Sequence, residues 1–367
     1  MPVGLVVMKW DDRIGTEILS KYPEELVITD KTLMQVYSTH EYSGESGMIS
    51  LMVGSLNIAS YYTGPEKGYY LLLLLNLDDD PDTYEGGLIN ASRAVLENLE
   101  EDTYKQMIPS LYRRLSIFPS LTEEQQLALT YQDDVKRLII NRLREEGVVS
   151  KSELMIWLKD RYRQGFIDLE GVIIELIKRE IVKEASVKGM QSEMIFLAND
   201  LWVMRIPPTI LYKSPSDKGL PSQFKDDYLT ESKKYFKNYY PSEEDNLKIS
   251  KILSDPQAYE VLRLLRTAIV TKNDLEKLKK KGVEDIDSIL NLFWENQMIL
   301  VFRDDKNTEY YALLSDFFIK LIFPKYLLNV IKFEYENRSK AEEVLIEYLK
   351  VLEDTYLDLK STEKSIK

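Results

Sequence analysis

Short apolar runs separated by polar turns occupy the first third of the chain. Five of them have the length of strands and lie at 3–8, 15–21, 48–53, 56–62 and 69–77. Apolar residues at helical spacing predict a helix over 30–41, and Pro81 opens a second helix of about 20 residues. The run at 69–77 is apolar without interruption as far as Leu75, which is typical of a strand buried on both faces. The predicted order is two strands, a helix, three strands and a helix.

An internal repeat occupies the middle of the chain. Three pairs of matching segments form it, which are 149–154 with 270–275, 173–177 with 289–293, and 197–201 with 313–317. The first pair, VSKSEL and VTKNDL, places a hydroxyl residue three positions before an acid, as at the start of a capped helix. Each copy reads as three helices followed by two strands, which is the winged-helix variant of the helix-turn-helix. The repeat therefore predicts two winged helices, at 131–205 and 247–322.

Two further segments connect or follow the repeats. Five prolines fall within 206–246, and this composition predicts an irregular, partly mobile linker. After Pro324, apolar residues recur at i, i+3, i+4 and i+7, which predicts one long helix over 326–360.

Charge is unevenly distributed along the chain. The protein has 48 Lys and Arg residues against 61 Asp and Glu residues, a net charge of −13. Residues 1–100 hold 6 of the basic and 16 of the acidic residues, so most of the excess acid lies in the N-terminal domain. A protein that coats nucleic acid non-specifically needs the opposite sign.

The start of the chain is apolar but has no basic leader. The longest apolar run, 69–75, is much shorter than the ~20 residues that span a membrane. We therefore expect a soluble cytoplasmic protein with no transmembrane segment, for which only peripheral contact with a membrane stays open.

The residue types exclude several chemistries. The chain has no cysteine and a single histidine, His40, so thiolate catalysis, disulfides and sites built on several histidines are excluded. It has no glycine-rich phosphate loop. We expect no enzymatic activity, no cofactor and no metal. His40 ends the predicted helix over 30–41, where a capping or packing role is expected.

The densest acidic cluster is Asp78–Asp82, which invites comparison with a calcium loop. Thr83 stands where such a loop requires glycine, and Ile89 stands where its last ligand, a glutamate, belongs. Acids before Pro81 also suit the N-terminus of a helix, because they complement its dipole. The second interpretation is favoured, and metal binding at this cluster stays open.

The two candidate recognition helices of the winged helices are acidic. The first, Asp168–Glu180, has two basic and four acidic residues, and the second, Glu284–Asn296, has four acids and no base. DNA phosphates would repel both helices. Basic and aromatic residues alternate instead in the linker, at Lys233, Lys234, Tyr235 and Lys237. This segment could contact RNA, single-stranded DNA or an anionic membrane, or its aromatic residues could anchor the linker on the body.

The order of elements in residues 1–118 resembles that of longin and roadblock-like domains, which are profilin-like α/β sandwiches. Combined with the repeat, it predicts an α+β protein with a longin-like domain, two winged helices and a long C-terminal helix. This combination resembles longin–winged-helix regulators of small GTPases, related to the nitrogen permease regulator-like and folliculin families. It also resembles the tandem winged-helix subunits of endosomal sorting.

These resemblances imply a non-enzymatic scaffold or regulator. Its partners would be a small Ras-like GTPase or a longin or roadblock protein, and the longin-like domain or the C-terminal helix could mediate dimerisation. Leu33, Val36 and Tyr37 of the first helix are candidates for the partner surface, although each could instead belong to the core. The alternative hypothesis is a transcription regulator, in which the front domain senses or dimerises and the winged helices bind DNA.

Overall fold

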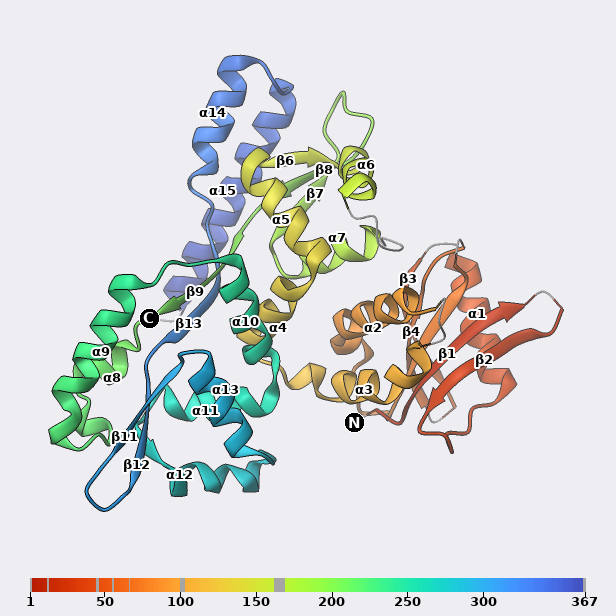
Figure 1. Cartoon of the computed structure of the whole chain (residues 1–367). Helices are drawn as coiled ribbons and strands as arrows, with labels where there is room; N and C mark the ends of the chain where they lie inside the picture. The colour runs from red at the N-terminus through yellow and green to blue at the C-terminus, as the bar shows by residue number, and fades with distance from the viewer. Residues whose placement is uncertain are drawn as a thin grey trace. The chain divides into compact units, whose positions relative to one another are not determined.

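A computed structural model describes residues 2–11, 13–43, 46–54, 56–65, 67–99, 103–161 and 169–365. The chain forms two compact units (Figure 1). The first comprises Met1–Leu121 with Ser152–Lys178, and the second comprises Thr122–Lys151 with Arg179–Lys367. Helices and strands are mixed, which confirms the α+β class. The segment predicted as the first winged helix, 131–205, is divided between the two units.

The first unit is built on one antiparallel sheet. Its strands are β1 (Gly4–Asp11), β2 (Gly15–Tyr22), β3 (Gly47–Val53), β4 (Leu56–Tyr62) and β5 (Tyr69–Leu75). They lie in the order β2-β1-β5-β4-β3, so that the most apolar strand is central, with β2 and β3 at the edges. The predicted order of strands and helices is confirmed in this segment.

Helices cover both faces of this sheet. Helix α1 (Asp30–Ser43) packs on the face that includes Leu72 and Leu74. Helices α2 (Glu85–Glu97) and α3 (Tyr104–Ile117) pack on the opposite face, which includes Leu71 and Leu73 (Figure 1). Alternate side chains of β5 thus enter two separate cores, which explains its uninterrupted apolar sequence. The 3₁₀ turns η1 (Pro81–Tyr84) and η2 (Phe118–Ser120) flank these helices. Helix α3 was not predicted.

Helices α6 (Lys151–Arg161) and α7 (Leu169–Lys178) lie at the sequence position of the first copy of the repeat. From Ser152 onward they group with the first unit, in which Lys178 forms an ion pair with Glu85 of α2.

The second unit contains the remaining elements of both copies. Its helices in the repeat are α4 (Glu123–Gln132), α5 (Asp134–Glu146), α10 (Glu243–Ser254), α11 (Pro256–Leu265), α12 (Lys272–Glu276) and α13 (Ile286–Glu295), with the 3₁₀ turn η5 (Lys277–Lys281). The carboxylates of Asp133 and Asp255 cap α5 and α11 in the same way, by accepting a hydrogen bond from the backbone three residues later. The two copies therefore begin alike.

Each copy also forms a three-stranded sheet of the same order. The first sheet is β6-β8-β7, with β6 (Val148–Ser150), β7 (Val182–Ala185) and β8 (Met194–Leu197). The second is β10-β12-β11, with β10 (Val270–Thr271), β11 (Ile299–Arg303) and β12 (Glu309–Leu313). The two strands predicted at the end of each copy are present and pair antiparallel, and in each copy a short strand earlier in the sequence completes the sheet.

A further strand leaves each copy and joins the two. Strands β9 (Asp200–Ile206) and β13 (Asp316–Ile322) pair antiparallel, with Asp200 opposite Ile322 and Asp316 opposite Ile206. Asp200 and Asp316 are matching positions of the repeat, and the matching residues Val203 and Ile319 face each other at the centre. The pairing is therefore symmetric, as at the interface of a two-fold dimer, although both halves belong to one chain.

The segment 206–246 is not the irregular linker that its prolines predicted. It contains α8 (Thr209–Lys213), the 3₁₀ turns η3 (Ser216–Lys218) and η4 (Ser222–Phe224), and α9 (Lys225–Asn238). Tyr228 of α9 is fully buried, and its hydroxyl donates to the carbonyl oxygen of Leu313, 2.7 Å away. Each proline lies at the start of a turn or helix or between elements, where a missing N–H costs little. The segment is thus an ordered arm over the second sheet.

The predicted helix over 326–360 is two helices, α14 (Leu327–Asn337) and α15 (Glu342–Ser365). The helix is interrupted at Arg338, which caps the C-terminus of α14 in the left-handed conformation, with a φ of 53°. Tyr348 of α15 is fully buried, and its hydroxyl donates to the carbonyl oxygen of Leu197, 3.0 Å away. Leu197 and Leu313 match in the repeat, so each copy extends an arm over the sheet of the other copy.

Among the described residues, every helix is too short or too polar to cross a lipid bilayer.

Candidate functional site

The first candidate surface, on α1, is mostly core. Leu33 is 1% exposed and Val36 is fully buried, so neither can present its side chain to a partner. Tyr37 stacks on Trp10 of β1, with ring centroids 3.8 Å apart. The apolar stripe that suggested a surface is the stripe by which α1 packs on the sheet. Leu33 and Val36 are therefore corrected from candidate surface to packing residues, whereas Tyr37 is half-buried and packs through its ring.

Carboxylates of the acidic cluster at 78–82 accept hydrogen bonds from nearby backbone N–H groups. A carboxylate oxygen of Asp80 accepts from the N–H of Asp82 at 3.1 Å, and one of Asp79 accepts from the N–H of Asn76 at 3.2 Å. These bonds shape the turn that leads into η1. Within the described ranges, no three His, Asp or Glu side chains are grouped so that they could hold a metal ion.

His40 lies in the core of the first unit, 1% exposed. One of its ring nitrogens, Nε2, is 2.9 Å from the hydroxyl of Ser60, and the rings of Tyr62 and Tyr70 lie beside it. Burial disfavours the charged imidazolium and lowers the pKa of His40 to about 4. The histidine is therefore a neutral packing residue at physiological pH.

This burial makes the stability of the first unit depend on pH. Between pH 6.5 and pH 4 the unfolded chain binds a proton at His40 that the folded chain does not bind, so stability falls as the pH falls. We expect about 2 kcal/mol less stability from this group at pH 5 than at pH 7. Denaturant unfolding at both pH values, followed for the wild type and His40→Gln, measures it. An equal pH dependence in the two proteins would contradict the assignment.

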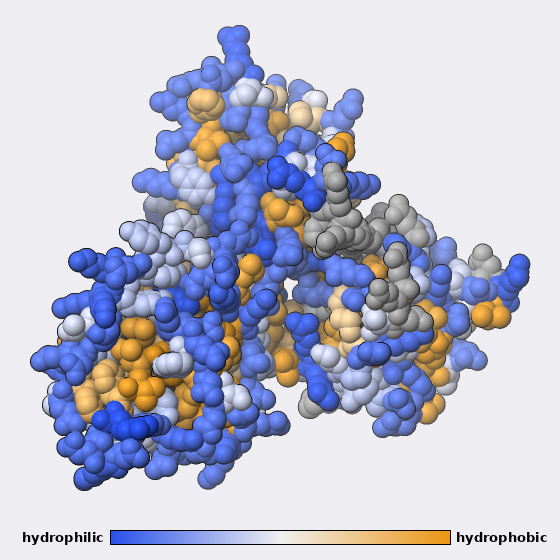
Figure 2. All heavy atoms as spheres, viewed as in Figure 1, coloured by the Kyte–Doolittle hydropathy of each residue, from blue (hydrophilic) through white to orange (hydrophobic). Residues whose placement is uncertain are grey.

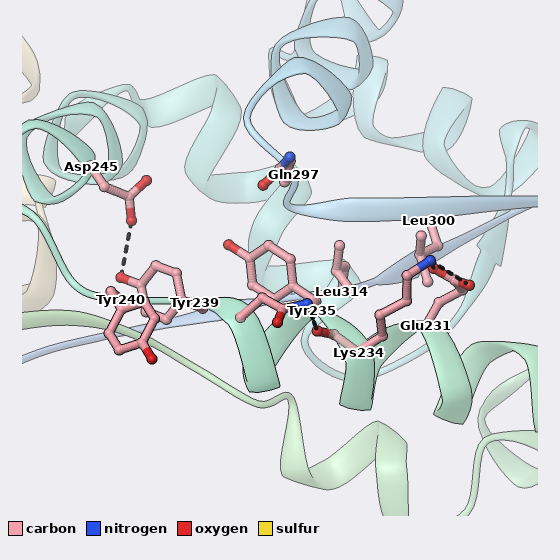
Figure 3. A pocket seen from close by; sticks show the side chains of 10 residues that line it. Glu231, Lys234, Tyr235, Tyr239, Tyr240, Asp245, Gln297, Leu300 and Leu314 are labelled. Atoms are coloured by element: carbon pink, nitrogen blue, oxygen red, sulfur yellow. Dashed lines mark hydrogen bonds and ion pairs between the residues drawn. The ribbon is translucent and has the colours of Figure 1, made fainter.

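The second candidate segment, on α9, lines a pocket of about 680 Å³ (Figure 3). Lys234 and Tyr235 belong to its lining, whereas Lys233 and Lys237 are exposed on the same helix. The full lining comes from α9, the turn after it, α10 and the β11–β12 sheet, and comprises Glu231, Lys234, Tyr235, Asn238, Tyr239, Tyr240, Asp245, Gln297, Leu300 and Leu314. This volume is in the range typical of ligand sites. Four of the sequence candidates thus share a helix, but only two share the pocket.

Aromatic and aliphatic side chains form much of the pocket surface. The rings of Tyr235 and Tyr239 are nearly parallel, with centroids 5.7 Å apart, and Tyr240 is 83% exposed. Leu300 and Leu314 complete the apolar part. Figure 2 shows hydrophobic side chains gathered on the face of the second unit that carries α9, β11 and α13 in Figure 1.

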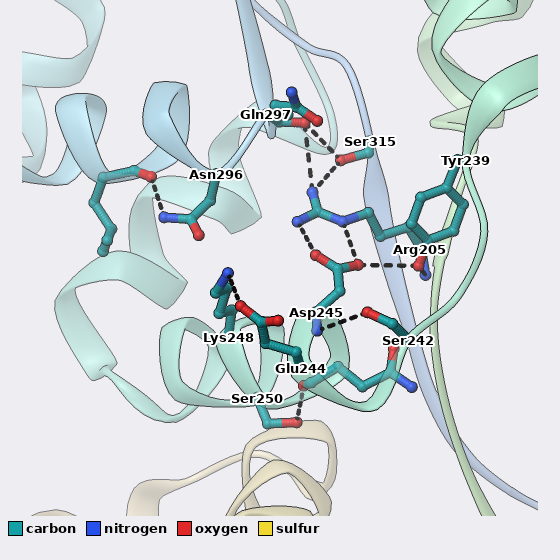
Figure 4. A network of polar contacts seen from close by, with 12 residues as sticks. Arg205, Tyr239, Ser242, Glu244, Asp245, Lys248, Ser250, Asn296, Gln297 and Ser315 are labelled. Carbon is teal, nitrogen blue, oxygen red and sulfur yellow. Dashed lines mark hydrogen bonds and ion pairs between the residues drawn. The ribbon is translucent and has the colours of Figure 1, made fainter.

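The charged groups of the pocket lining are paired. The ammonium of Lys234 lies 3.4 Å from the carboxylate of Glu231. Asp245 receives two hydrogen bonds from the buried guanidinium of Arg205, at 2.7 and 2.9 Å, and one from the hydroxyl of Tyr239 at 3.0 Å (Figure 4). Arg205 also donates to the hydroxyl of Ser315 at 2.9 Å. This network forms a rigid wall behind the pocket.

The network stays in one protonation state at physiological pH. Burial opposes ionisation of Asp245, but the hydrogen bonds and positive charge of Arg205 outweigh burial and lower the pKa of Asp245 below its usual value. Burial, followed by the charge of Asp245, raises the pKa of Tyr239 to about 12. Tyr239 is therefore a neutral donor to an ionised carboxylate. Sequence patterns missed Arg205 and Asp245, because 40 residues separate them.

The candidate recognition helices correspond to α7 and α13, although Asp168 lies outside the described residues. On α13, Asp287 forms an ion pair with Lys272 at 2.7 Å. Trp294 of the same helix is 64% exposed and Leu292 is 37% exposed. The solvent face of α13 is thus acidic and apolar.

No protein-family model matches this chain, and comparison with curated proteins and with solved structures finds no significant match.

Proposed function

We propose that this protein is a non-enzymatic scaffold or regulator that binds protein partners through its N-terminal sheet. The resemblance to longin–winged-helix regulators supplies the partner class, a small Ras-like GTPase or a longin or roadblock protein. A single antiparallel sheet enclosed by α1 and by the α2–α3 pair supports the longin-like assignment. Two matched copies with the same sheet order support the tandem winged helices.

The observation that carries the proposal is the composition of the edge strand β3. Its sequence, GMISLMV, contains no charged residue and no proline, and Met52 is 63% exposed. Soluble proteins usually protect such edges with charges or proline, because an open apolar edge pairs with other strands. The other edge strand, β2, does carry charges, at Glu17 and Lys21. An unprotected edge on one side only is suited to strand addition by a partner.

The test compares two apolar-to-lysine substitutions on the two edges. We expect Met52→Lys, on β3, to reduce partner capture at least tenfold, because a lysine there protects the edge. Ile18→Lys, on β2, is the matched control and is expected to capture as the wild type does. Captured proteins from the source cell are identified by mass spectrometry, with a small GTPase or a longin or roadblock protein expected. Equal capture by wild type and Met52→Lys would overturn the edge assignment.

The alternative function is a DNA-binding transcription regulator. The acidic solvent face of α13 speaks against it, because carboxylates brought to phosphates weaken binding. The arm also packs on the second sheet, because Phe224 of η4 and Tyr228 of α9 both contact Phe302 of β11, with ring centroids 5.4 and 6.2 Å apart. A gel shift with genomic DNA at physiological salt separates the two functions. We expect no shift, and tight binding would favour the regulator.

A further inference from the structure

Helix α15 (Figure 1) carries an exposed stripe on the side opposite its packing face. The packing face, from which Tyr348 bonds to the first sheet, holds the buried residues Leu345, Tyr348, Leu352 and Thr355. On the opposite side, exposed residues recur at alternating spacings of three and four, as in a heptad pattern. They are Glu343, Ile346, Lys350, Glu353, Leu357 and Lys360, which we call the α15 stripe.

The fold of an arm does not require the aliphatic residues of the α15 stripe. Ile346 is 47% exposed and Leu357 is 56% exposed. Counting from the matched arm tyrosines, α9 has Asp226 and Lys237 at these two positions, and both are exposed. The arm of the first copy thus lies on its sheet with polar residues on this side. Exposed aliphatic residues are ordinary when they are scattered, so the argument turns on how these two are arranged with the charges around them.

The chemistry of the α15 stripe complements itself when its direction is reversed. Read along the chain it is acid, aliphatic, base, acid, aliphatic, base. Two such stripes laid antiparallel bring an acid opposite a base and an aliphatic residue opposite an aliphatic residue at every position. The pairs are Glu343 with Lys360, Ile346 with Leu357, and Lys350 with Glu353. In a parallel pair each residue would face its own counterpart, so every charged position would meet a like charge.

We propose that the α15 stripe is a dimerisation surface, on which α15 of a second molecule of this protein lies antiparallel. A two-fold dimer joins the same surface of both molecules, so that surface has to complement itself. The α15 stripe meets this condition, and it runs for about 26 Å at 1.5 Å per residue. The inference does not rest on the proposed partner binding, because it uses a surface other than the β3 edge.

The residues beside the α15 stripe fit the same arrangement. Leu349 and Tyr356 lie along one flank and are 45% and 44% exposed, and in the antiparallel pair Leu349 of one molecule lies beside Tyr356 of the other. Along the other flank, Glu347 comes near Asp354 of the second molecule. Glu347 already binds Lys350 at 3.0 Å, and like charges at an exposed rim cost little. The flanks therefore add apolar contact on one side and leave the other side open to water.

The test measures the mass of the full chain by sedimentation velocity over a hundredfold range of protein concentration. The wild type is expected to pass from monomer to dimer within this range, because few aliphatic side chains hold the pair. Lys350→Glu is expected to raise the dissociation constant at least tenfold, since two symmetric acid–base pairs become acid–acid pairs. The combined variant Lys350→Glu/Glu353→Lys reverses both charges. It is expected to restore the dissociation constant to within threefold of the wild-type value.

Lys234→Glu on α9 is the matched control. The Lys234 side chain is 67% exposed and pairs with Glu231, three residues before it. The Lys350 side chain is 62% exposed and pairs with Glu347 at the same spacing. The two substitutions therefore change charge and helix pairing alike, but Lys234 lies outside the α15 stripe. Lys234→Glu is expected to dimerise as the wild type does, and both variants are expected to keep the wild-type circular dichroism.

Several results would overturn the inference. A monomer at every concentration would do so, as would a dimer that Lys350→Glu leaves intact or that the combined variant fails to restore. Met52→Lys protects the β3 edge and is expected to dimerise normally, so loss of the dimer in this variant alone would assign self-association to the edge. Partner capture is a separate measurement on a separate surface. Failure of the dimer with intact, Met52-dependent partner capture would overturn this inference and leave the proposed function standing.

Discussion

Replacing Arg266 with alanine is expected to lower the free energy of unfolding of the second unit by about 3–5 kcal/mol. Arg266 ends α11 and donates two hydrogen bonds of 2.7 Å to Glu124 of α4 and one of 2.7 Å to Asp316 of β13. All three side chains are about four-fifths buried, with 20% of their surface exposed. Removing the cation leaves two carboxylates desolvated without a counter-charge, which is more costly than the loss of the bonds alone. Denaturant unfolding at pH 7 measures the effect.

A double replacement of the acids supplies the control. Glu124→Gln and Asp316→Asn remove the charges that Arg266→Ala would leave unpaired, so the triple variant is expected to be more stable than Arg266→Ala alone. Burial raises the pKa of Asp316, which agrees with a carboxylate that depends on its arginine. A cost below about 1 kcal/mol for Arg266→Ala would show that the pair behaves as a surface ion pair.

Truncating either arm tyrosine is expected to cost about 3–5 kcal/mol, the usual range for a large aromatic residue in a core. Tyr348 fills the space beside Gly147, where an added Cβ would lie 2.6 Å from its ring, and it packs against Phe196 with centroids 5.4 Å apart. Tyr228 packs against Phe302 in the other copy. We therefore expect Tyr348→Ala and Tyr228→Ala to have similar effects on thermal and denaturant unfolding.

The conservative variants isolate the hydroxyl. Tyr348→Phe and Tyr228→Phe keep the packing and lose the bond to Leu197 or Leu313, for which about 1 kcal/mol is expected. If either alanine variant costs no more than its phenylalanine counterpart, the arm does not depend on ring packing, and the matched roles of α9 and α15 would be wrong.

The two copies of the repeat are held together because each one extends an arm, α9 or α15, over the sheet of the other copy. Strands β9 and β13 pair symmetrically, and each copy then extends a helix over the sheet of the other. The buried arginine pairs follow the same symmetry, because Asp200 accepts from Arg144 as Asp316 accepts from Arg266, each at 2.7 Å. The Arg205 network has no such counterpart, since the residue that matches Arg205 is Leu321. Two members of this network, Asp245 and Tyr239, line the pocket beside α9.

Periodic apolar patterns predicted the elements well where one element faces one core. The strands and first helix of residues 1–75 lie within a few residues of their predicted bounds, because alternation and helical spacing record burial directly. The prediction of an irregular linker over 206–246 was wrong for a related reason. Proline content was taken as a sign of irregular structure, whereas α9 is a polar helix with two buried residues, Tyr228 and Ser232, and Tyr228 bonds it to the second sheet.

The candidate site shows the same limit. Lys234 and Tyr235 stood out because they are adjacent in sequence, and they do share the pocket. Leu33 and Val36 stood out as apolar residues at helical spacing, and they are core, because one apolar stripe can face a partner or the protein's own sheet with the same spacing. Arg205, Asp245 and Leu300 join the site from three distant segments that no local pattern connects.

The sequence by itself determined the α+β class, most of the elements and the existence of the repeat, because these depend on local spacing and on self-similarity. It also determined the absence of cysteine chemistry and the acidity of the front domain. Only the tertiary structure decided that the two copies pair through β9 and β13, that each arm lies over the sheet of the other copy, and that a pocket lies beside α9. Those features depend on contacts between residues about a hundred positions apart, which chain folding alone brings together.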